Sequence, residues 1–249
     1  MLSLPIAAGF AAAIVSTSFI SGIFGMAGGM ILLGILLAFM PLAPAMVLHG
    51  LVQMASSGWR AWQWRAHIDW RIVAHYAASA AIATLAIGSA AVTASKSIAL
   101  IIIGLTPFIG LALPPQFAPD LRRRGHDYGC GALCTVLQLL AGVSGPILDV
   151  FFVRSKMSRH KVVATKAMTQ SFSHLQKILY FGAITVGEGA NVHWGVAGMM
   201  IALAVVGTSL SRTVLEKMND QSFRQWTRWT VMSVGVVYLV SGVVLLLKN

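Results

Sequence analysis

The chain has 249 residues, of which 57% are hydrophobic and 10% are charged, and its mean hydropathy is +0.79. A water-soluble domain carries about 25% charged residues, so this composition excludes an ordinary soluble enzyme or binding module. The net charge of +11 would suit a nucleic-acid-binding protein, but the basic residues fall between apolar runs, as the positive-inside rule requires of a membrane protein. We therefore expect a lipid bilayer as partner and no nucleic acid.

Apolar segments follow one another along the whole chain. Runs of about 20 apolar residues cross a bilayer as helices, because lipid offers no partner to unpaired backbone groups. No basic region precedes the first segment, so we do not expect a cleaved signal peptide. The sequence predicts an all-α, multi-pass integral membrane protein with apolar segments at about 4–24, 30–40, 44–64, 70–94, 97–114, 129–141, 146–153, 162–184, 194–211 and 229–247.

A stretch rich in proline and arginine divides the chain into two halves that resemble each other. Gly25-Met-Ala-Gly28-Gly29 matches Ala141-Gly142-Val-Ser144-Gly145, which gives a repeat of roughly 116 residues. With one residue of slip, His49, Gln53, Ser56 and Arg60 then correspond to Lys166, Gln170, Ser173 and Lys177. Duplication with polar positions inside apolar helices is typical of transporters. The expected divisions are a first repeat at 1–114, a cytoplasmic linker at 115–128 and a second repeat at 129–249.

The basic residues test the topology. If 129–153 were one plain crossing, the basic loops would fall on both sides of the membrane, against the positive-inside rule. If each glycine motif is instead the tip of a re-entrant hairpin, the basic loops at 60–71, 115–128, 154–161 and 212–228, which hold fourteen of the 18 Lys and Arg residues, share one face. We therefore predict a helix bundle of two inverted repeats, each a re-entrant helical hairpin plus three transmembrane helices.

The glycine motifs suit an anion site. Each motif ends one helix and begins another, and helix N-termini expose unpaired N–H groups with partial positive charge. The alternative is that these glycines only allow close helix packing. The same choice applies to the polar faces that follow, where inward side chains either line a cavity or bond neighbouring helices. The expected substrate site comprises Gly25, Gly28, Gly29, His49, Gln53, Ser56, Gly142, Ser144, Gly145, Lys166, Gln170, Ser173 and His174.

Charged residues inside the apolar segments are few. We expect Arg60 and Lys177 to extend their side chains to the membrane interface. Asp149 is the one clear acid, with Leu33 at the matching place in the first half; it is a candidate either to pair with Lys166 or to couple transport to protons. His49 and His174 are candidates to load protons or to act as hydrogen-bonding partners.

Cys130 and Cys134 lie one helical turn apart in an apolar stretch. We interpret them as core residues, without a disulfide or a metal site. No cofactor is expected. The sequence is compatible with a homodimer.

Three runs carry a family resemblance: SGIFGMAGGM (21–30), LAGVSGPIL (140–148) and HKVVATKAMTQSFSHLQKILYFG (160–182). Over essentially the whole chain, the sequence resembles the sulfite exporter TauE/SafE family of membrane transporters. The resemblance implies inverted repeats, a site near the glycine motifs, and movement of sulfite, sulfonates or sulfoacetate, generally outward.

We therefore expect a secondary transporter of a small anion in the bacterial cytoplasmic (inner) membrane. One alternative is a rhomboid-like intramembrane serine protease, because Gly142-Val-Ser144-Gly145 fits the GxSG pattern and His174 lies on a later helix. Another is a non-transporting membrane subunit that hands a substrate to a partner. The chain has no GxxxxGK[ST] motif for ATP, so transport would depend on an ion gradient or the membrane potential.

Overall fold

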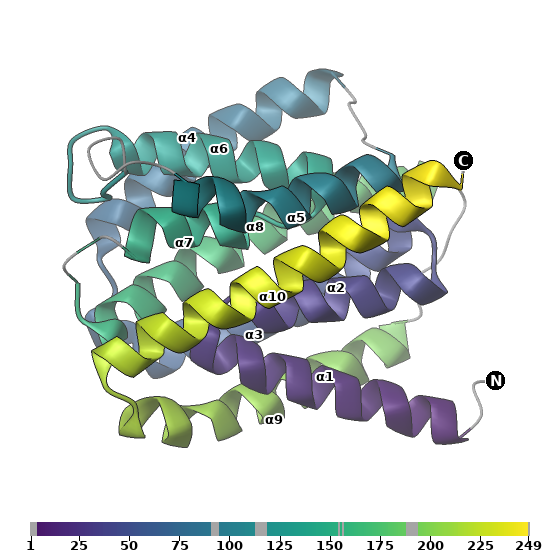
Figure 1. Cartoon of the computed structure of the whole chain (residues 1–249), viewed down its shortest axis with the longest axis horizontal. Coiled ribbons are helices and arrows are strands. Elements are labelled where there is room, and N and C mark those ends of the chain that lie inside the picture. Colours follow the sequence, from purple (N-terminus) through teal and green to yellow (C-terminus); the bar gives the residue numbers. More distant parts are fainter. Residues whose placement is uncertain are drawn as a thin grey trace.

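The computed structural model describes residues 4–90, 95–112, 119–153, 155, 157–187 and 194–248. Across these ranges the regular structure is entirely helical (Figure 1). The predicted all-α fold is therefore confirmed. The helices are α1 (Leu4–Phe24), α2 (Ala27–Phe39), α3 (Leu42–Gln63), the short 3-10 helix η1 (Arg65–His67), α4 (Trp70–Ala90), α5 (Lys96–Ala112), α6 (His126–Ala141), α7 (Gly145–Val153), α8 (Arg159–Gly187), α9 (Trp194–Lys217) and α10 (Asp220–Leu247).

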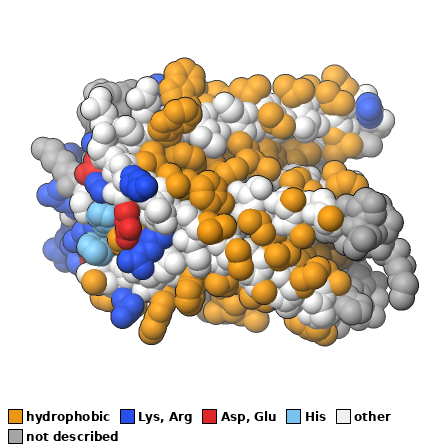
Figure 2. Space-filling view, turned by 90° about the horizontal axis from the view of Figure 1, so that it is seen from below, with side chains coloured by type: hydrophobic (Ala, Val, Ile, Leu, Met, Phe, Trp, Pro, Cys, Tyr) orange, Lys and Arg blue, Asp and Glu red, His pale blue; other side chains and the backbone are white. Residues whose placement is uncertain are grey.

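The surface of the molecule is that of a membrane protein. Hydrophobic side chains cover its middle, whereas Lys, Arg, acidic and His side chains gather at one end (Figure 2). Within the described ranges, α4, α9 and α10 each contain a stretch long and apolar enough to cross a bilayer. Large apolar side chains on these helices, such as Leu85, Leu210 and Val237, are exposed because lipid rather than protein covers them.

The two ends of the helix bundle differ in their charged side chains. Helices α6, α8 and α10 begin at one end of the bundle, and α1 begins and α10 ends at the other (Figure 1). The first of these ends is the one with the charged side chains (Figure 2). Parts of the predicted basic loops, including Arg154, Lys156 and residues 115–118, lie outside the described residues.

The helices pack in a pattern that links the two halves of the chain. The most extensive contact joins α3 to α8; α5 packs against α10, α1 against α9, and α4 against α6. The same pattern results when each helix is matched with the helix five positions later in the chain. The α1–α9 pair then corresponds to the α6–α4 pair, and the α3–α8 and α5–α10 pairs each correspond to themselves. The polar helices α3 and α8 thus lie in the interior, and the apolar helices surround them.

Two apolar clusters hold this arrangement together. One contains Leu36 of α2 and Met46 of α3; the other contains Phe152 of α7 and Cys134 of α6. Cys130 and Cys134 are free, buried thiols with their sulfur atoms 3.9 Å apart, as expected of core residues. Close packing of these clusters fixes the two short helices α2 and α7 beside the interior pair.

Each short helix is reached through a tight turn at glycine. Gly25 has a φ of +86° and Gly142 has a φ of +79°, a left-handed conformation that favours glycine. Their N–H groups donate to the carbonyl groups of Ser21 and Gln138, at 2.8 and 2.9 Å, so each glycine ends the preceding helix in the same way. The structure therefore makes Gly25 and Gly142 equivalent.

This equivalence corrects the alignment of the repeats. Gly142 follows Gly25 by 117 positions, and Lys166 follows His49 by the same interval, so no slip is needed. The sequence alignment placed Gly25 opposite Ala141 because both motifs contain several small residues that tolerate a shift of one. In the corrected register the position equivalent to Asp149 is Leu32 rather than Leu33.

Candidate functional site

A small polar cavity lies between the two hairpin turns and the interior helices. It has a volume of about 20 Å³, enough for about one water molecule. Polar side chains reach it from α3, α6 and α8, and both turns contribute backbone. Its lining residues are Met26, Gly29, Met30, His49, Gln53, Gln138, Val143, Ser144, Gly145, Gln170, Ser173 and His174.

The first half of the chain contributes His49 and Gln53, one helical turn apart on α3. The Nε2 atom of His49 lies 2.8 Å from the carbonyl oxygen of Gly29, and Lys177 Nζ lies 2.6 Å from His49 Nδ1. An ammonium group only donates hydrogen bonds, so Nδ1 accepts and Nε2–H donates to Gly29. His49 is therefore held as a neutral ring between the two halves. Gln53 packs against Gly29, and its Nε2 has no hydrogen-bond partner within the described part of the chain.

The second half contributes Gln170, Ser173 and His174 on α8. The Ser173 hydroxyl lies 2.6 Å from the hydroxyl of Tyr76. His174 Nδ1 lies 3.3 Å from the side-chain nitrogen of Gln138, and the rings of His174 and His49 meet edge to face with centroids 5.6 Å apart. Gln138 was missed at the sequence level, although a glutamine in the apolar run 129–141 was the signal that would have indicated it.

Two buried cations lie behind this lining. Arg60 donates to the carbonyl oxygen of Ser21 and, at 2.8 Å, to Gln170 Oε1. Lys177 donates to His49 and, at 2.8 Å, to the carbonyl oxygen of Gly142. The expectation that Arg60 and Lys177 reach the membrane interface is wrong, since both side chains are fully buried. The carbonyl groups that end α1 and α6 attract these cations inward.

A third buried cation, Lys166, pairs with Asp149, as the sequence had suggested for this acid. The Lys166 side chain lies against Gly25, where an added Cβ atom would collide with its end. Asp149 is thus the partner of one of three interior cations. The other two have only neutral partners in the described ranges, so basic side chains outnumber acidic ones beside the cavity.

The two hairpin turns meet at this site. A Cβ atom added at Gly145 would collide with Met26 of the first turn, and one added at Gly142 would collide with Met46 of α3. Contact this close requires residues without a side chain. The turns, the cations and the cavity therefore form one connected centre.

Two of the expected site residues lie away from the cavity. The Ser56 hydroxyl is 2.6 Å from that of Thr208 on α9, and Gly28 packs against the α1 backbone at Thr17. For these residues the geometry matches the packing alternative. Gly25, Gly142, Lys166 and Asp149 do not line the cavity; Lys166 pairs with Asp149 and lies against Gly25.

The geometry does not support the protease alternative. Ser144 lies at the second turn, but the hydrogen bonds of His174 and His49 in the described structure go to Gln138, Gly29 and Lys177. A serine nucleophile needs a base within hydrogen-bond reach. The GxSG pattern instead supplies small residues for the contact with the first turn.

A family model described as sulfite exporter TauE/SafE matches residues 10–238, which include both turns, the cavity and the buried cations. The chain belongs to the sulfite exporter TauE/SafE family. No curated protein and no solved structure matches the chain. TauE/SafE proteins are membrane transporters rather than enzymes, so the family confirms the transport class predicted from the sequence. For a TauE/SafE transporter, a buried cavity beside an excess of basic side chains is the candidate substrate site.

Proposed function

We propose that this chain is a secondary transporter that exports a small anion, such as sulfite, sulfoacetate or another organosulfonate, across the bacterial cytoplasmic membrane. The family supplies the class of cargo. One observation supports the central cavity as its site: Arg60, Lys166 and Lys177 lie behind its lining, and of these only Lys166 has an acidic partner, Asp149, in the described structure. Buried charge without a counter-charge is costly, so an anion entering the cavity would offset that cost.

We further propose that directional hydrogen bonds select the anion. Gln53 Nε2 has no hydrogen-bond partner in the described structure, and Gln170 and Ser173 reach the same space. The N-terminus of α2 at Ala27 and that of α7 at Gly145 add backbone N–H groups from opposite halves. An oxyanion accepts hydrogen bonds on every side, which suits donors arranged around it.

The transport cycle we propose is alternating access between two inverted repeats, 1–114 and 129–249, joined by a cytoplasmic linker at 115–128. Three observations support this cycle. The α1–α9 contact corresponds to the α4–α6 contact, the turns at Gly25 and Gly142 are equivalent, and the charged side chains gather at one end of the bundle. The cavity holds only about one water, which fits an occluded state. Rocking of one repeat against the other would open it to each side in turn.

The membrane potential favours export of a solute that crosses with a net negative charge. Moving one elementary charge through 100 mV changes its free energy by about 2.3 kcal/mol, and an inside-negative potential pushes anions outward. This proposal therefore needs no ATP-binding motif.

Flux measurements on Lys177 test the function. In proteoliposomes the unmodified protein should move sulfite or sulfoacetate, and Lys177→Met should reduce that flux by about 10- to 100-fold, the effect of losing a charged hydrogen bond of about 1.5–3 kcal/mol. Lys161→Met, which removes a half-exposed lysine at the charged end, should transport normally. Equal flux in the two variants would exclude the central cavity as the site. Thermal-shift measurements with sulfite, sulfoacetate, taurine and sulfate would rank the candidate substrates.

Cysteine accessibility tests the topology. Arg122→Cys, Lys161→Cys and Lys217→Cys should all be labelled by a membrane-impermeant thiol reagent from one side of the membrane. Lys248→Cys should be labelled from the other side, because α10 ends at the opposite end of the bundle. Labelling of positions 122 and 161 from opposite sides would refute the hairpin arrangement.

A further inference from the structure

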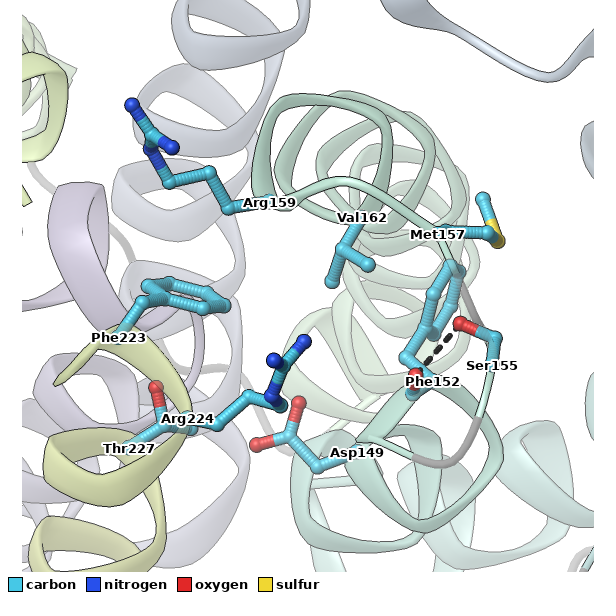
Figure 3. A pocket seen from close by; sticks show the side chains of 9 residues that line it. All are labelled: Asp149, Phe152, Ser155, Met157, Arg159, Val162, Phe223, Arg224 and Thr227. Atoms are coloured by element: carbon cyan, nitrogen blue, oxygen red, sulfur yellow. Dashed lines mark hydrogen bonds between the residues drawn. The ribbon is translucent and has the colours of Figure 1, made fainter. Parts of the chain in front are cut away.

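A second cavity lies beside Asp149, separate from the central one. It is enclosed by α7, the start of α8 and the first turns of α10 (Figure 3). Asp149 and Thr227 lie on one side of it, and Arg159 lies at the start of α8 on the other. The charged end of the bundle is near, since α8 and α10 both begin there (Figure 1).

Three polar atoms at this cavity have no hydrogen-bond partner in the described structure. They are Oδ2 of Asp149, Nε of Arg159 and Oγ1 of Thr227, and all three belong to residues that line the cavity. Thr227 is 3% exposed and Asp149 is 8% exposed, so bulk water does not satisfy them. Buried polar atoms are nearly always hydrogen-bonded, and a convergent set of them indicates a place for ordered water.

The size of the cavity decides what it can hold. Its volume is about 20 Å³, close to the minimum of roughly 10–15 Å³ that one water molecule needs. A water here can bond to the free oxygen of Asp149 and to Thr227, which meets the requirement for two or more polar partners. The lining excludes an anion, because the unpartnered carboxylate oxygen of Asp149 would repel it. The cavity therefore suits water and protons rather than the transported solute.

Asp149 lies between the two cavities. Its Oδ1 atom pairs with Lys166, and Lys166 lies against Gly25, next to Met26 in the lining of the central cavity. Its Oδ2 atom has no partner in the described structure, and the residue lines the second cavity. An anion in the central cavity can therefore compete for Lys166 from one side, while water reaches the carboxylate from the other.

We propose that Asp149 is a proton-binding site that exchanges protons with the charged end of the molecule through this water-sized cavity. In the state described here Lys166 holds Asp149 as a carboxylate. When Lys166 turns to an anion, the carboxylate loses its partner; a proton from the solvent at the charged end, relayed through the cavity water, then forms an O–H bond at Oδ2 and leaves the water as H₂O. Lys166 remains an ammonium ion throughout. This coupling rests on the proposed function and makes the proton move with the anion, so that a dianion such as sulfoacetate still carries one net negative charge across the membrane.

Other charged groups face Asp149 and oppose its protonation. Arg60 on α3 acts on it electrostatically, and Arg224 on α10 lines the same cavity (Figure 3). Arg159 on α8 lies across the cavity and pairs with Asp220 at 3.1 Å. Lys166 is the charged group in direct contact with Asp149. We therefore expect the departure of Lys166 to determine whether Asp149 binds a proton.

Infrared spectroscopy tests the proton site without a substrate. Lys166→Gln mimics the departure of the lysine, so the purified variant should show the carbonyl stretch of a protonated carboxyl group near neutral pH. Adding Asp149→Asn to that variant should abolish the band. A Lys166→Gln variant that shows no such band would overturn the proposal, because Asp149 would then stay ionised without its partner.

The role of the cavity is tested by exchange into heavy water. In the Lys166→Gln protein, adding Thr227→Val removes a hydroxyl from the cavity at almost constant volume and should slow deuterium exchange of the Asp149 band at least tenfold. Thr135→Val is the matched control, because Thr135 also has a buried hydroxyl without a partner in the described structure but does not line this cavity. Equal exchange rates in the two variants would refute the path.

Flux of unmodified protein separates this proposal from the function on which it rests. In proteoliposomes with an entrapped pH dye, a sulfoacetate gradient should move protons in the direction of the anion, and Asp149→Asn should remove that proton movement. Sulfoacetate flux without proton movement would overturn the coupling and leave the proposed function standing. Absence of sulfoacetate flux would count against the proposed substrate, and the infrared result would still decide whether Asp149 binds protons.

Discussion

The polar faces of α3 and α8 occupy equivalent places in the two halves, but their charged side chains have different partners. Arg60 and Lys177 are alike: each donates to the carbonyl end of its own first helix and to a side chain of the other half. His49 and Lys166 differ. His49 is a ring between a carbonyl group and a lysine, whereas Lys166 has a carboxylate partner in Asp149.

The two halves therefore share features of their framework and differ in their charged side chains. The shared features, a glycine turn and an inward cation, are those that join the halves. The features confined to the second half are a lysine and an aspartate, which form an ion pair. The first half contributes His49 and Gln53 to the cavity and has no ion pair at the equivalent place.

The largest expected effect comes from giving the first half the acid that it lacks. Leu32, the equivalent of Asp149, is fully buried in an apolar cluster, and His49 is already engaged by Gly29 and Lys177. Leu32→Asp should therefore destabilise the protein by about 3–5 kcal/mol, the cost of an uncompensated buried charge. Thermal unfolding in detergent would measure this, with the uncharged Leu32→Asn as control. If the unfolding temperature of Leu32→Asp is not below that of Leu32→Asn, the first half can accommodate a buried carboxylate, and the difference that we describe between the halves is wrong.

A smaller effect is expected at the two turns, where the halves are alike. Gly25→Ala and Gly142→Ala should each lower stability by about 1–2 kcal/mol, because alanine resists a positive φ. Gly25→Ala should in addition reduce anion flux more, since its methyl group would collide with Lys166. Gly182→Ala is the control, because an added Cβ atom meets nothing within 4 Å there. Unfolding temperatures that match the control would show that the turns are not constrained as described.

The smallest expected effect on stability comes from the Asp69–Lys161 pair at the charged end, away from the interior ion pair. Burial alone would raise the pKa of Asp69, but the hydrogen bonds from Lys161 at 2.9 Å and from the Ile72 backbone, together with the charges of Lys161 and Arg71, lower it. The pair therefore stabilises the fold above the unfolded pKa of about 3.9, and this contribution is lost as the pH falls through the lowered pKa.

Asp69→Asn keeps an acceptor for the Ile72 N–H group and removes only the charge. We expect it to lower stability by less than about 1 kcal/mol at pH 7, as is usual for an exposed pair, and by less still in acid. Thermal unfolding at a series of pH values would measure the difference between the variant and the unmodified protein. A stability difference that grows as the pH falls would contradict the lowered pKa of Asp69.

The sequence predicted the helices well because long apolar segments have few alternatives in lipid. It also indicated the pairing of Asp149 with Lys166, since an intramembrane acid needs a cation. It failed for Arg60 and Lys177, because a long side chain near a helix end can turn toward the interface or inward, and only tertiary carbonyl partners decide between the two. It gave the repeats the wrong register because neighbouring small residues are interchangeable until the backbone angles are known.

Ser56 and Gln138 illustrate the remaining limit. Both are polar positions on apolar helices, yet Ser56 bonds to α9 and Gln138 lines the cavity. Which neighbour a helix face meets depends on how the other helices pack, and periodicity along one helix does not contain that information.

The buried thiols of Cys130 and Cys134 provide a built-in measure of motion. Cys134 lies directly behind the second turn, with its sulfur 4.0 Å from the carbonyl oxygen of Ser144. An alkylating reagent can reach these thiols only when the surrounding helices separate. The rate of alkylation in the native chain therefore reports how often the second hairpin opens, without any engineered probe.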